Sequence, residues 1–208
     1  MRSLVESYGV PCAAARVART RADALSIAGE LGYPVALKIV SQAVTHKSDV
    51  GGVRLDLTDP EELRRAYDVL ESRASAARVS MDGALVQRMV PRGVELFVGM
   101  TRDAQVGPLI AFGVGGTMVE LFGDVVFRIA PLGRVDADEM IEGIRARRVL
   151  DGYRGAPRVD RDALRAVLLA VSRLAVEMTE VSELDLNPLV ALGADGLLAV
   201  DARVRVGK

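Results

Sequence analysis

The pattern of hydrophobic and polar residues predicts strands and helices in turn through the N-terminal part of the chain. Thr20 followed by Asp23 has the spacing of a capping box and predicts a helix that ends at Gly32. The apolar run Val35–Val40, with turn residues on both sides, is typical of a strand buried on both faces. Val53–Leu57 alternates between hydrophobic and polar residues, which predicts a half-buried strand.

A further helix is predicted to begin after Asp59 and to reach about Ser72. Asp59, Pro60 and Glu62 suit its N-cap, first and third positions. The predicted order of this part is therefore β-α-β-β-α-β. The next part is predicted to be rich in strands, at 84–90, 94–100, 108–112 and 125–129.

The C-terminal part predicts a broken helix over 137–149 and a continuous helix capped by Asp160. The apolar stripe of the second helix is assigned to the core rather than to a cofactor site. A hairpin is predicted from 183–192 and 197–204, with its turn at 193–196. The stripe consists of Leu164, Val167, Leu168, Val171, Leu174, Ala175 and Met178.

Length and composition set the broad class. The 208 residues are 50% hydrophobic, which is enough for the cores of two small subdomains. The predicted fold class is α/β, in the mixed α+β sense, with one subdomain at 1–88 and another at 89–208. The segment 87–93 is the predicted connection between them.

Charge and cysteine content exclude several classes of partner. The 27 Lys and Arg residues nearly balance 28 Asp and Glu residues, so the bulk charge of −1 attracts neither nucleic acid nor an anionic membrane. Cys12 is the single cysteine and has no partner for an internal disulfide. The N-terminus lacks the pattern of a secretory signal, and no apolar stretch approaches the roughly 20 residues of a membrane span. These features predict a cytoplasmic protein.

Lys38 is a candidate binding residue because it interrupts an apolar strand. A buried ammonium group without an anion costs several kcal/mol. Two structural explanations stay open at this point. The amine can extend to water over an apolar surface, or it can form an ion pair with Glu95, which also interrupts a strand.

The polar loop 41–52 follows Lys38 and has the composition of a phosphate-binding loop. It contains Gly51 and Gly52, whose backbone N–H groups are unobstructed, together with Lys47 and the single histidine, His46. A neutral imidazole can move a proton or accept a phosphoryl group. Gly pairs also form ordinary turns, and a lone histidine is often a surface residue.

Asp185, Asn187 and Asp201 form a second group of polar residues, in the C-terminal hairpin. Alternation places Asp185 and Asn187 on one face, and a three-residue turn at 193–195 places Asn187 opposite Asp201. Few side-chain oxygens, completed by water and phosphate, are typical of Mg²⁺ sites. A bulge at Pro188 would change this parity, and a solvated hairpin face remains the alternative.

The motifs in this order resemble the ATP-grasp domain of nucleoside-diphosphate-forming acyl-CoA synthetases, the acetate–CoA ligase (ADP-forming) β-subunit type related to succinyl-CoA synthetase β. The resemblance covers nearly the whole chain, and the motif that contains His46 is its most specific part. It implies an ATP-grasp fold with the nucleotide in a cleft between two subdomains. The matching positions are 8–11, 32–38, 46–53, 86–90, Glu95, 107–108, 112–116, Glu120, Asp124, Arg128, Pro131, 183–189 and Asp201.

For ligand binding, the resemblance implies ATP or ADP together with Mg²⁺. The phosphates would lie near Lys38 and the glycine loop, and the adenine near the backbone of 87–90. Asn187 and Asp201 match the metal ligands, with Asp185 beside them, and Arg128 is a further candidate phosphate contact. The expected nucleotide contacts are Lys38, Lys47, Gly51, Gly52, Gln87, Met89, Val90 and Glu95.

For chemistry, the resemblance implies that acyl-CoA, ADP and phosphate are interconverted with carboxylic acid, CoA and ATP. A CoA-binding α subunit would carry a phosphohistidine, and His46 would be a second relay station for its phosphoryl group. The expected assembly is a hetero-oligomer in which this chain is inactive alone. One alternative is a regulatory ATP-grasp module without turnover, which intact His46, Asn187 and Asp201 disfavour. The other is a carboxylate–amine ligase, which the His46 loop disfavours.

Overall fold

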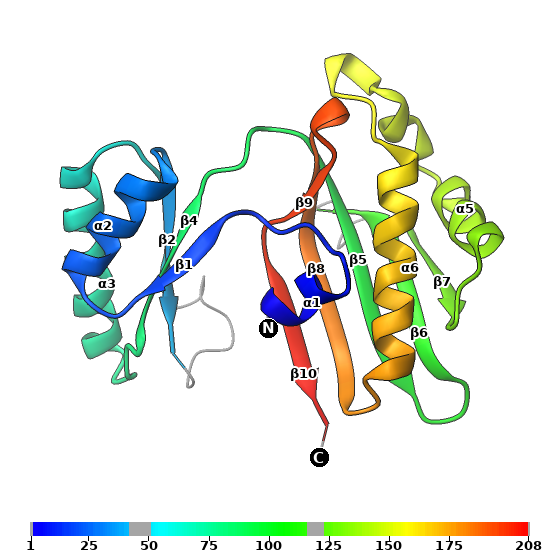
Figure 1. The fold of residues 1–208 in the computed structure, drawn as a ribbon, viewed down its shortest axis with the longest axis horizontal. Helices are drawn as coiled ribbons and strands as arrows, with labels where there is room; N and C mark the ends of the chain where they lie inside the picture. Colours follow the sequence, from blue (N-terminus) through cyan, green and yellow to red (C-terminus); the bar gives the residue numbers. More distant parts are fainter. Residues whose placement is uncertain (1, 42–50, 116–122, 208) are drawn as a thin grey trace. The chain divides into compact units, whose positions relative to one another are not determined.

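The computed structural model, whose ribbon is shown in Figure 1, describes residues 2–41, 51–115 and 123–207. The chain divides into two compact units. The smaller unit comprises Ala13–Met89, and the larger unit combines the preceding residues with the chain from Val90 onward. The smaller unit ends at Met89, and the predicted division lies between residues 88 and 89. The N-terminal segment differs from the prediction, because Val5 and Val10 pack in the core of the larger unit.

The smaller unit is an antiparallel sheet with two helices on one face. Its elements are β1 (Ala15–Ala18), α2 (Arg21–Leu31), β2 (Val35–Val40), β3 (Val53–Leu57), α3 (Pro60–Ala76) and β4 (Gly83–Arg88). The predicted order β-α-β-β-α-β is confirmed, and the strands lie in the order β1-β4-β2-β3. Val35 and Leu37 of β2 share one core with Leu63 and Leu70 of α3. None of the described helices packs on the other side of this sheet, which is named its helix-free face.

Both helices of this unit begin at the predicted residues. The Thr20 hydroxyl accepts a hydrogen bond from the Asp23 N–H at 3.1 Å, and the Asp23 carboxylate accepts one from the Thr20 N–H, which completes the capping box. The Asp59 carboxylate caps α3 by accepting the N–H of its third residue at 2.8 Å. Helix α3 continues beyond the predicted end at Ser72, because buried Ala74 extends its apolar stripe.

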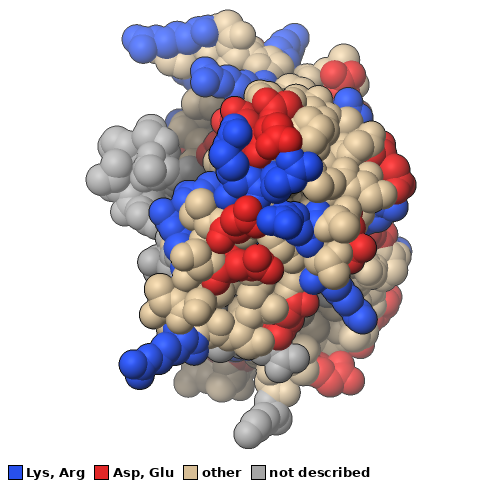
Figure 2. All heavy atoms as spheres, turned by 90° about the vertical axis from the view of Figure 1, so that its left-hand side faces the viewer, with Lys and Arg blue, Asp and Glu red and all other residues tan. Residues whose placement is uncertain are grey.

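Basic and acidic side chains lie beside one another on the side of the smaller unit seen in Figure 2. Arg21 of α2 and Asp68 of α3 form an ion pair of 2.6 Å, and Arg16 of β1 pairs with Glu30 of α2 at 2.6 Å. These pairs are exposed, so each contributes at most about 1 kcal/mol to stability. The mixture of signs leaves this side without a strong field of either charge.

The larger unit has a six-stranded sheet in the order β10-β8-β5-β6-β7, with β9 paired to β8. Its elements are α1 (Arg2–Ser7), β5 (Val94–Asp103), β6 (Gly107–Val114), β7 (Val125–Ile129), α5 (Arg134–Gly143), α6 (Arg161–Glu177), β8 (Val181–Ala191), β9 (Leu197–Ala199) and β10 (Ala202–Val206). Helices α5 and α6 pack against this sheet. The predicted broken helix is α5 followed by a 3₁₀ turn at Arg147–Asp151.

The core of the larger unit contains the apolar stripe predicted for α6. Six of the seven predicted residues are buried, and Met178 is partly buried against the same core. The stripe meets Leu96, Val98, Ile110 and Phe112 from the sheet, so these side chains define the covered face. No helix of the described ranges packs on the opposite face, which is likewise named the helix-free face. Among the described residues, no helix has the length and apolar character needed to cross a membrane.

Arg102 of β5 closes the C-terminal end of α6. Its guanidinium donates hydrogen bonds to the carbonyl oxygens of Ala175 at 2.8 Å, Met178 at 3.4 Å and Val181 at 3.3 Å. The last carbonyls of a helix have no partners within the helix. Arg102→Met is therefore expected to lower the free energy of unfolding by about 2–4 kcal/mol, since partly buried carbonyls lose a charged donor.

Denaturant unfolding of the two proteins measures this change. Arg147→Met, which removes an exposed arginine from the 3₁₀ turn, is the matched control and should change stability by less than about 0.5 kcal/mol. Equal stability of Arg102→Met and the control would show that water replaces the guanidinium at the end of α6.

Candidate functional site

Lys38 lies on the helix-free face of the smaller sheet and is buried. Leu37 points into the core beneath α3, and strand alternation turns Lys38 to the other side. Its neighbours in register are Leu85 of β4 and Val53 of β3. Lys38 is only 7% exposed, so the idea that its amine extends freely into water is wrong. The other explanation, an ion pair, concerns Glu95, which belongs to the larger unit.

Gln87 shares this face with Lys38. It pairs with Ala36, two residues from Lys38 along β2, and is 4% exposed. The two polar side chains are therefore diagonal neighbours on adjacent strands. The N–H of Met89 donates to the Pro34 carbonyl at 3.0 Å, so the fold already uses this expected adenine contact as a donor. Val90, the next expected contact, is partly buried at the start of the larger unit.

The end of the predicted phosphate loop is held on two sides. The Gly52 carbonyl accepts the Ile39 N–H at 2.7 Å, which joins the loop to β2 one residue after Lys38. The Gly51 carbonyl accepts a hydrogen bond from Arg73 of α3 at 2.8 Å. The predicted site residues His46 and Lys47 lie outside the described residues.

The hairpin places Asn187 opposite Asp201, as the register argument predicts. On the turn side of Asn187, Ala191 pairs with Leu197. On its other side, Leu186 pairs with Ala202 in the same register. A bulge does occur in β8 at Asn187, since the register with β5 shifts there. Asn187 still lies opposite Asp201, because the second strand of the hairpin is interrupted beside Asn187, between β9 and β10.

Asp185 has the most unusual environment of the three candidate metal ligands. It lies on β8 with Gly99 of β5 on one side and Arg203 of β10 on the other. Its Oδ1 atom is buried and has no hydrogen-bond partner among the described residues. Burial raises the pKa of the Asp185 carboxyl, the Arg203 guanidinium lowers it, and the Asp201 carboxylate raises it. Asp185 and Asp201 are thus close enough to interact electrostatically.

The oxygens of Asp185, Asn187 and Asp201 suit a magnesium ion that also binds water and phosphate. They do not suit a metal ion that is held by protein ligands alone. An unpartnered buried carboxylate oxygen is a position that a cation satisfies. In the described parts of the chain, no group of three or more His, Cys, Asp or Glu side chains could hold a metal. Asn187 is exposed, so its amide oxygen is accessible from solvent. Asp185, Asn187 and Asp201 together match the sparse oxygen set of a Mg²⁺ site completed by water and phosphate.

Glu95 lies on the helix-free face of the larger sheet, as Asp185 does. Val94 and Leu96 point into the core, so alternation turns Glu95 to the other side, where it is exposed and pairs in register with Val190. The larger unit therefore presents Glu95 and Asp185 on one face, and Asp201 is near enough to Asp185 to interact with it electrostatically. The smaller unit presents Lys38 and Gln87 on its own helix-free face.

Arg128 does not join this group. It pairs in register with Ile110, whose side chain is in the core, so Arg128 lies on the face covered by α5. Its guanidinium contacts Glu139 of α5 at 3.2 Å. The phosphate contact of Arg128 stays a prediction, and strand alternation places this residue on the side opposite Glu95 and Asp185.

Two arginines of these regions were not anticipated from sequence. Arg203 follows from the same hairpin register that pairs Asn187 with Asp201, which also places it opposite Asp185. Arg73 gave no signal, because its contact with Gly51 joins a helix to a loop 22 residues away.

Comparison with known proteins identifies the family of this chain. A family model described as an ATP-grasp domain matches residues 1–206. The β subunit of acetate–CoA ligase [ADP-forming] I from Pyrococcus furiosus is 42% identical over 205 residues, which cover 98% of this chain and 88% of that subunit.

Two similar solved structures are both of dinucleotide forming acetyl-coenzyme A synthetase 1 from Ca. Korarchaeum cryptofilum. The complex with coenzyme A, Ca-AMPCP and HgCl⁺ has a TM-score of 0.94 and 43% identity, and covers 99% of this chain and 90% of that one. The complex with coenzyme A and Mg-AMPPCP, whose phosphohistidine segment points towards the nucleotide binding site, has a TM-score of 0.86 and 42% identity, with coverage of 99% and 89%. The chain therefore belongs to the ATP-grasp domain family and, within it, to the β subunits of ADP-forming acetate–CoA ligases.

Proposed function

We propose that this chain binds ADP or ATP for an ADP-forming acyl-CoA synthetase. In the forward direction, acyl-CoA, ADP and phosphate give carboxylic acid, CoA and ATP. The observation that carries the proposal is the position of Lys38, a buried cation that lies beside the glycine end of the loop 41–52. A cation next to backbone amides of a glycine loop suits a nucleotide phosphate. The similarity to β subunits of acetate–CoA ligases supports the same assignment.

The residues of the smaller unit suit the phosphates and the base. Lys38 offers a charged donor, and Gly52 offers a backbone N–H beside it. Gln87 is buried near Lys38 and offers an amide. Since the Met89 N–H is used within the fold, Met89 is left with its carbonyl oxygen and side chain for the adenine. Val90 and Glu95, which belong to the larger unit, are the other two proposed nucleotide contacts.

The proposed metal is Mg²⁺, held by Asn187 and Asp201 with Asp185 beside them. When bound, it neutralises phosphate charge during phosphoryl transfer. Asp185 carries the strongest sign of such a ligand, since its buried Oδ1 has no partner among the described residues. The Arg203 side chain balances part of the acidic charge of this hairpin and helps to keep the Asp185 carboxylate ionised.

The proposed partner is a CoA-binding subunit that carries a phosphohistidine. The related Korarchaeum complex, in which a phosphohistidine segment points towards the nucleotide binding site, supports this idea. We place His46 as a relay. The P–N bond to the partner's histidine breaks as one forms to an imidazole nitrogen of His46, and that bond then breaks as a terminal ADP oxygen takes the phosphoryl group.

The nucleotide assignment is tested by Lys38→Met, which keeps the length of the side chain and removes its charge. The isolated wild-type chain is expected to bind ADP in calorimetry. The variant should bind ADP about 10- to 100-fold more weakly, because a charged hydrogen bond of about 1.5–3 kcal/mol is lost.

Arg65→Met, an exposed arginine on α3, is the control and should bind ADP like the wild type. Urea unfolding of both variants confirms that they are folded. Equal ADP affinity for Lys38→Met and Arg65→Met would place the phosphates elsewhere, and no binding by the wild type would refute the nucleotide assignment.

A further inference from the structure

Arg73 connects helix α3 to the end of the loop 41–52. It lies in the last turn of α3, and its Nη1 donates a hydrogen bond to the Gly51 carbonyl oxygen at 2.8 Å. Arg73 is an exposed side chain, and its guanidinium makes no other hydrogen bond among the described residues. The Arg73 side chain therefore fixes the position of the Gly51 carbonyl and contributes little to the packing of α3.

Gly51 is adapted to this contact in two ways. Its φ of +59° lies in the left-handed region, which glycine adopts without strain. A Cβ atom at this position would also collide with the Arg73 guanidinium. The glycine therefore lets the guanidinium reach the carbonyl oxygen, and any other residue would push the two apart.

The contact determines where the next amide points. The peptide bond between Gly51 and Gly52 is planar and trans, so its C=O and N–H groups point in opposite directions. With the Gly51 oxygen held by Arg73, the Gly52 N–H points away from the guanidinium. The Gly52 carbonyl, which belongs to the next peptide group, accepts the Ile39 N–H at 2.7 Å, so the peptide groups on both sides of the Gly52 Cα are restrained.

The freed amide lies beside Lys38. Gly52 precedes Val53, which pairs with Lys38 across β2 and β3. Helix α3 packs on the face of this sheet opposite Lys38, and the contact with Arg73 of this helix turns the Gly52 N–H away from the guanidinium. In the described ranges, the Gly52 N–H has no hydrogen-bond partner. An ammonium group and an open amide on one side form a site for an anion.

We infer that Arg73 is a positioning residue, which orients the Gly51–Gly52 peptide so that the Gly52 N–H binds a nucleotide phosphate next to Lys38. The inference rests on the proposed nucleotide-binding function. Without Arg73, the peptide is free to rotate and can turn its carbonyl oxygen toward the phosphate, where the two negative groups repel. Arg73 itself remains on the α3 side and does not touch the nucleotide.

The test compares ADP with adenosine in binding titrations of the whole chain. Arg73→Met should weaken ADP binding about tenfold, equal to about 1.4 kcal/mol, and leave adenosine binding within about twofold of wild type. Arg73→Lys keeps a charged donor and should recover ADP affinity to within about threefold. Gly51→Ala should weaken ADP binding to the same extent as Arg73→Met, since it displaces the guanidinium.

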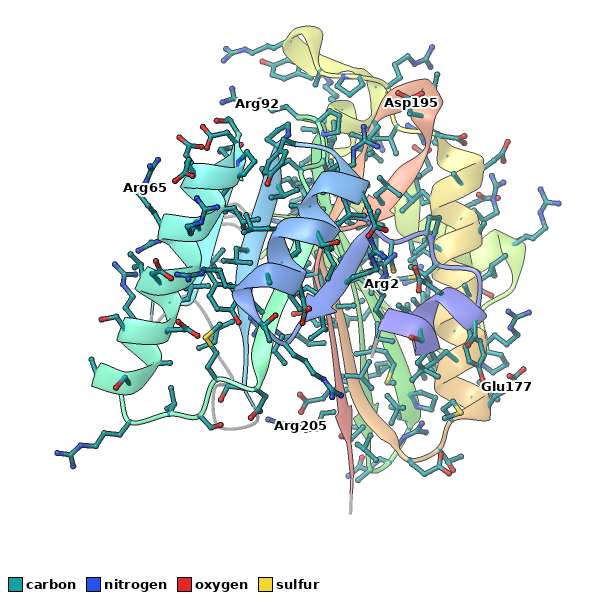
Figure 3. The ribbon with its side chains drawn as sticks, turned by 60° about the vertical axis from the view of Figure 1, so that its left-hand side comes forward. Arg2, Arg65, Arg92, Glu177, Asp195 and Arg205 are labelled. Carbon is teal, nitrogen blue, oxygen red and sulfur yellow. The ribbon has the colours of Figure 1, made fainter. Side chains whose placement is uncertain are left out.

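Arg65→Met is the matched control, because Arg65 lies on the same helix and points away from it in Figure 3. It should bind both ligands like the wild type. The inference is overturned if Arg73→Met binds ADP as tightly as this control, or if it loses ADP and adenosine affinity equally, as general damage to the fold would produce. Failure of the wild type to bind ADP would instead refute the proposed function itself.

Discussion

Replacement of His46 by asparagine is expected to abolish ATP formation while ADP affinity stays within about threefold of wild type, a change below about 1 kcal/mol. His46 is the single histidine of the chain. A neutral imidazole nitrogen can accept a phosphoryl group, whereas the asparagine amide keeps hydrogen-bonding capacity without a nucleophilic ring nitrogen. The assay supplies acyl-CoA, ADP, phosphate and the CoA-binding partner, and measures both ATP and acid-labile phosphate on the protein.

The isolated wild-type chain provides the baseline for this experiment. It should bind ADP and form no ATP, because its one histidine is the proposed receiver of the phosphoryl group and the donor histidine belongs to the partner. ATP synthesis by His46→Asn at the wild-type rate would reduce His46 to a binding residue. Full turnover by the isolated chain would show that no partner is required.

Removal of the Asp201 carboxylate should uncouple magnesium binding from nucleotide binding. Asp185, Asn187 and Asp201 supply few oxygens, so the wild type is expected to bind Mg²⁺ weakly alone and at least about tenfold more tightly with ADP. Asp201→Ala should lose most of that gain. Calorimetric titration of Mg²⁺ with and without ADP measures the coupling directly.

Asp195→Ala is the matched control for this change. Asp195 lies in the turn of the same hairpin, is exposed, and is labelled in Figure 3. Its removal changes the net charge equally but should leave the coupling intact. Equal affinity of the wild type for Mg²⁺ in the presence and absence of ADP would contradict the assignment of the hairpin as a metal site.

The parts of the fold that depend on neighbours in sequence were predictable. The cap of α2 at Thr20 is a local hydrogen-bond pattern, and so is the cap of α3 at Asp59. The opposition of Asn187 and Asp201 follows from the length of one turn, because a hairpin register extends along both of its strands. Even the bulge beside Asn187 left this pairing unchanged.

The parts that depend on distant contacts were not predictable in the same way. The face on which Arg128 lies depends on how β7 is aligned with β6 and not on its own strand alone. The predicted boundary of the smaller unit missed the N-terminal residues, since Val5 and Val10 find their core partners far along the chain. The contact of Arg73 with Gly51 is equally invisible to any local pattern.

The placement of the N-terminal segment has a consequence for the order of folding. The Pro11 carbonyl accepts the Ala199 N–H at 2.8 Å, and the Tyr8 carbonyl accepts a hydrogen bond from Arg173 at 3.0 Å. Ala13–Met89 is therefore an insertion, whose two ends both return to the larger unit. During synthesis from the N-terminus, the inserted unit can complete its own core first. The residues before Ala13 must wait for Arg173 and Ala199 to be made before they can form these contacts.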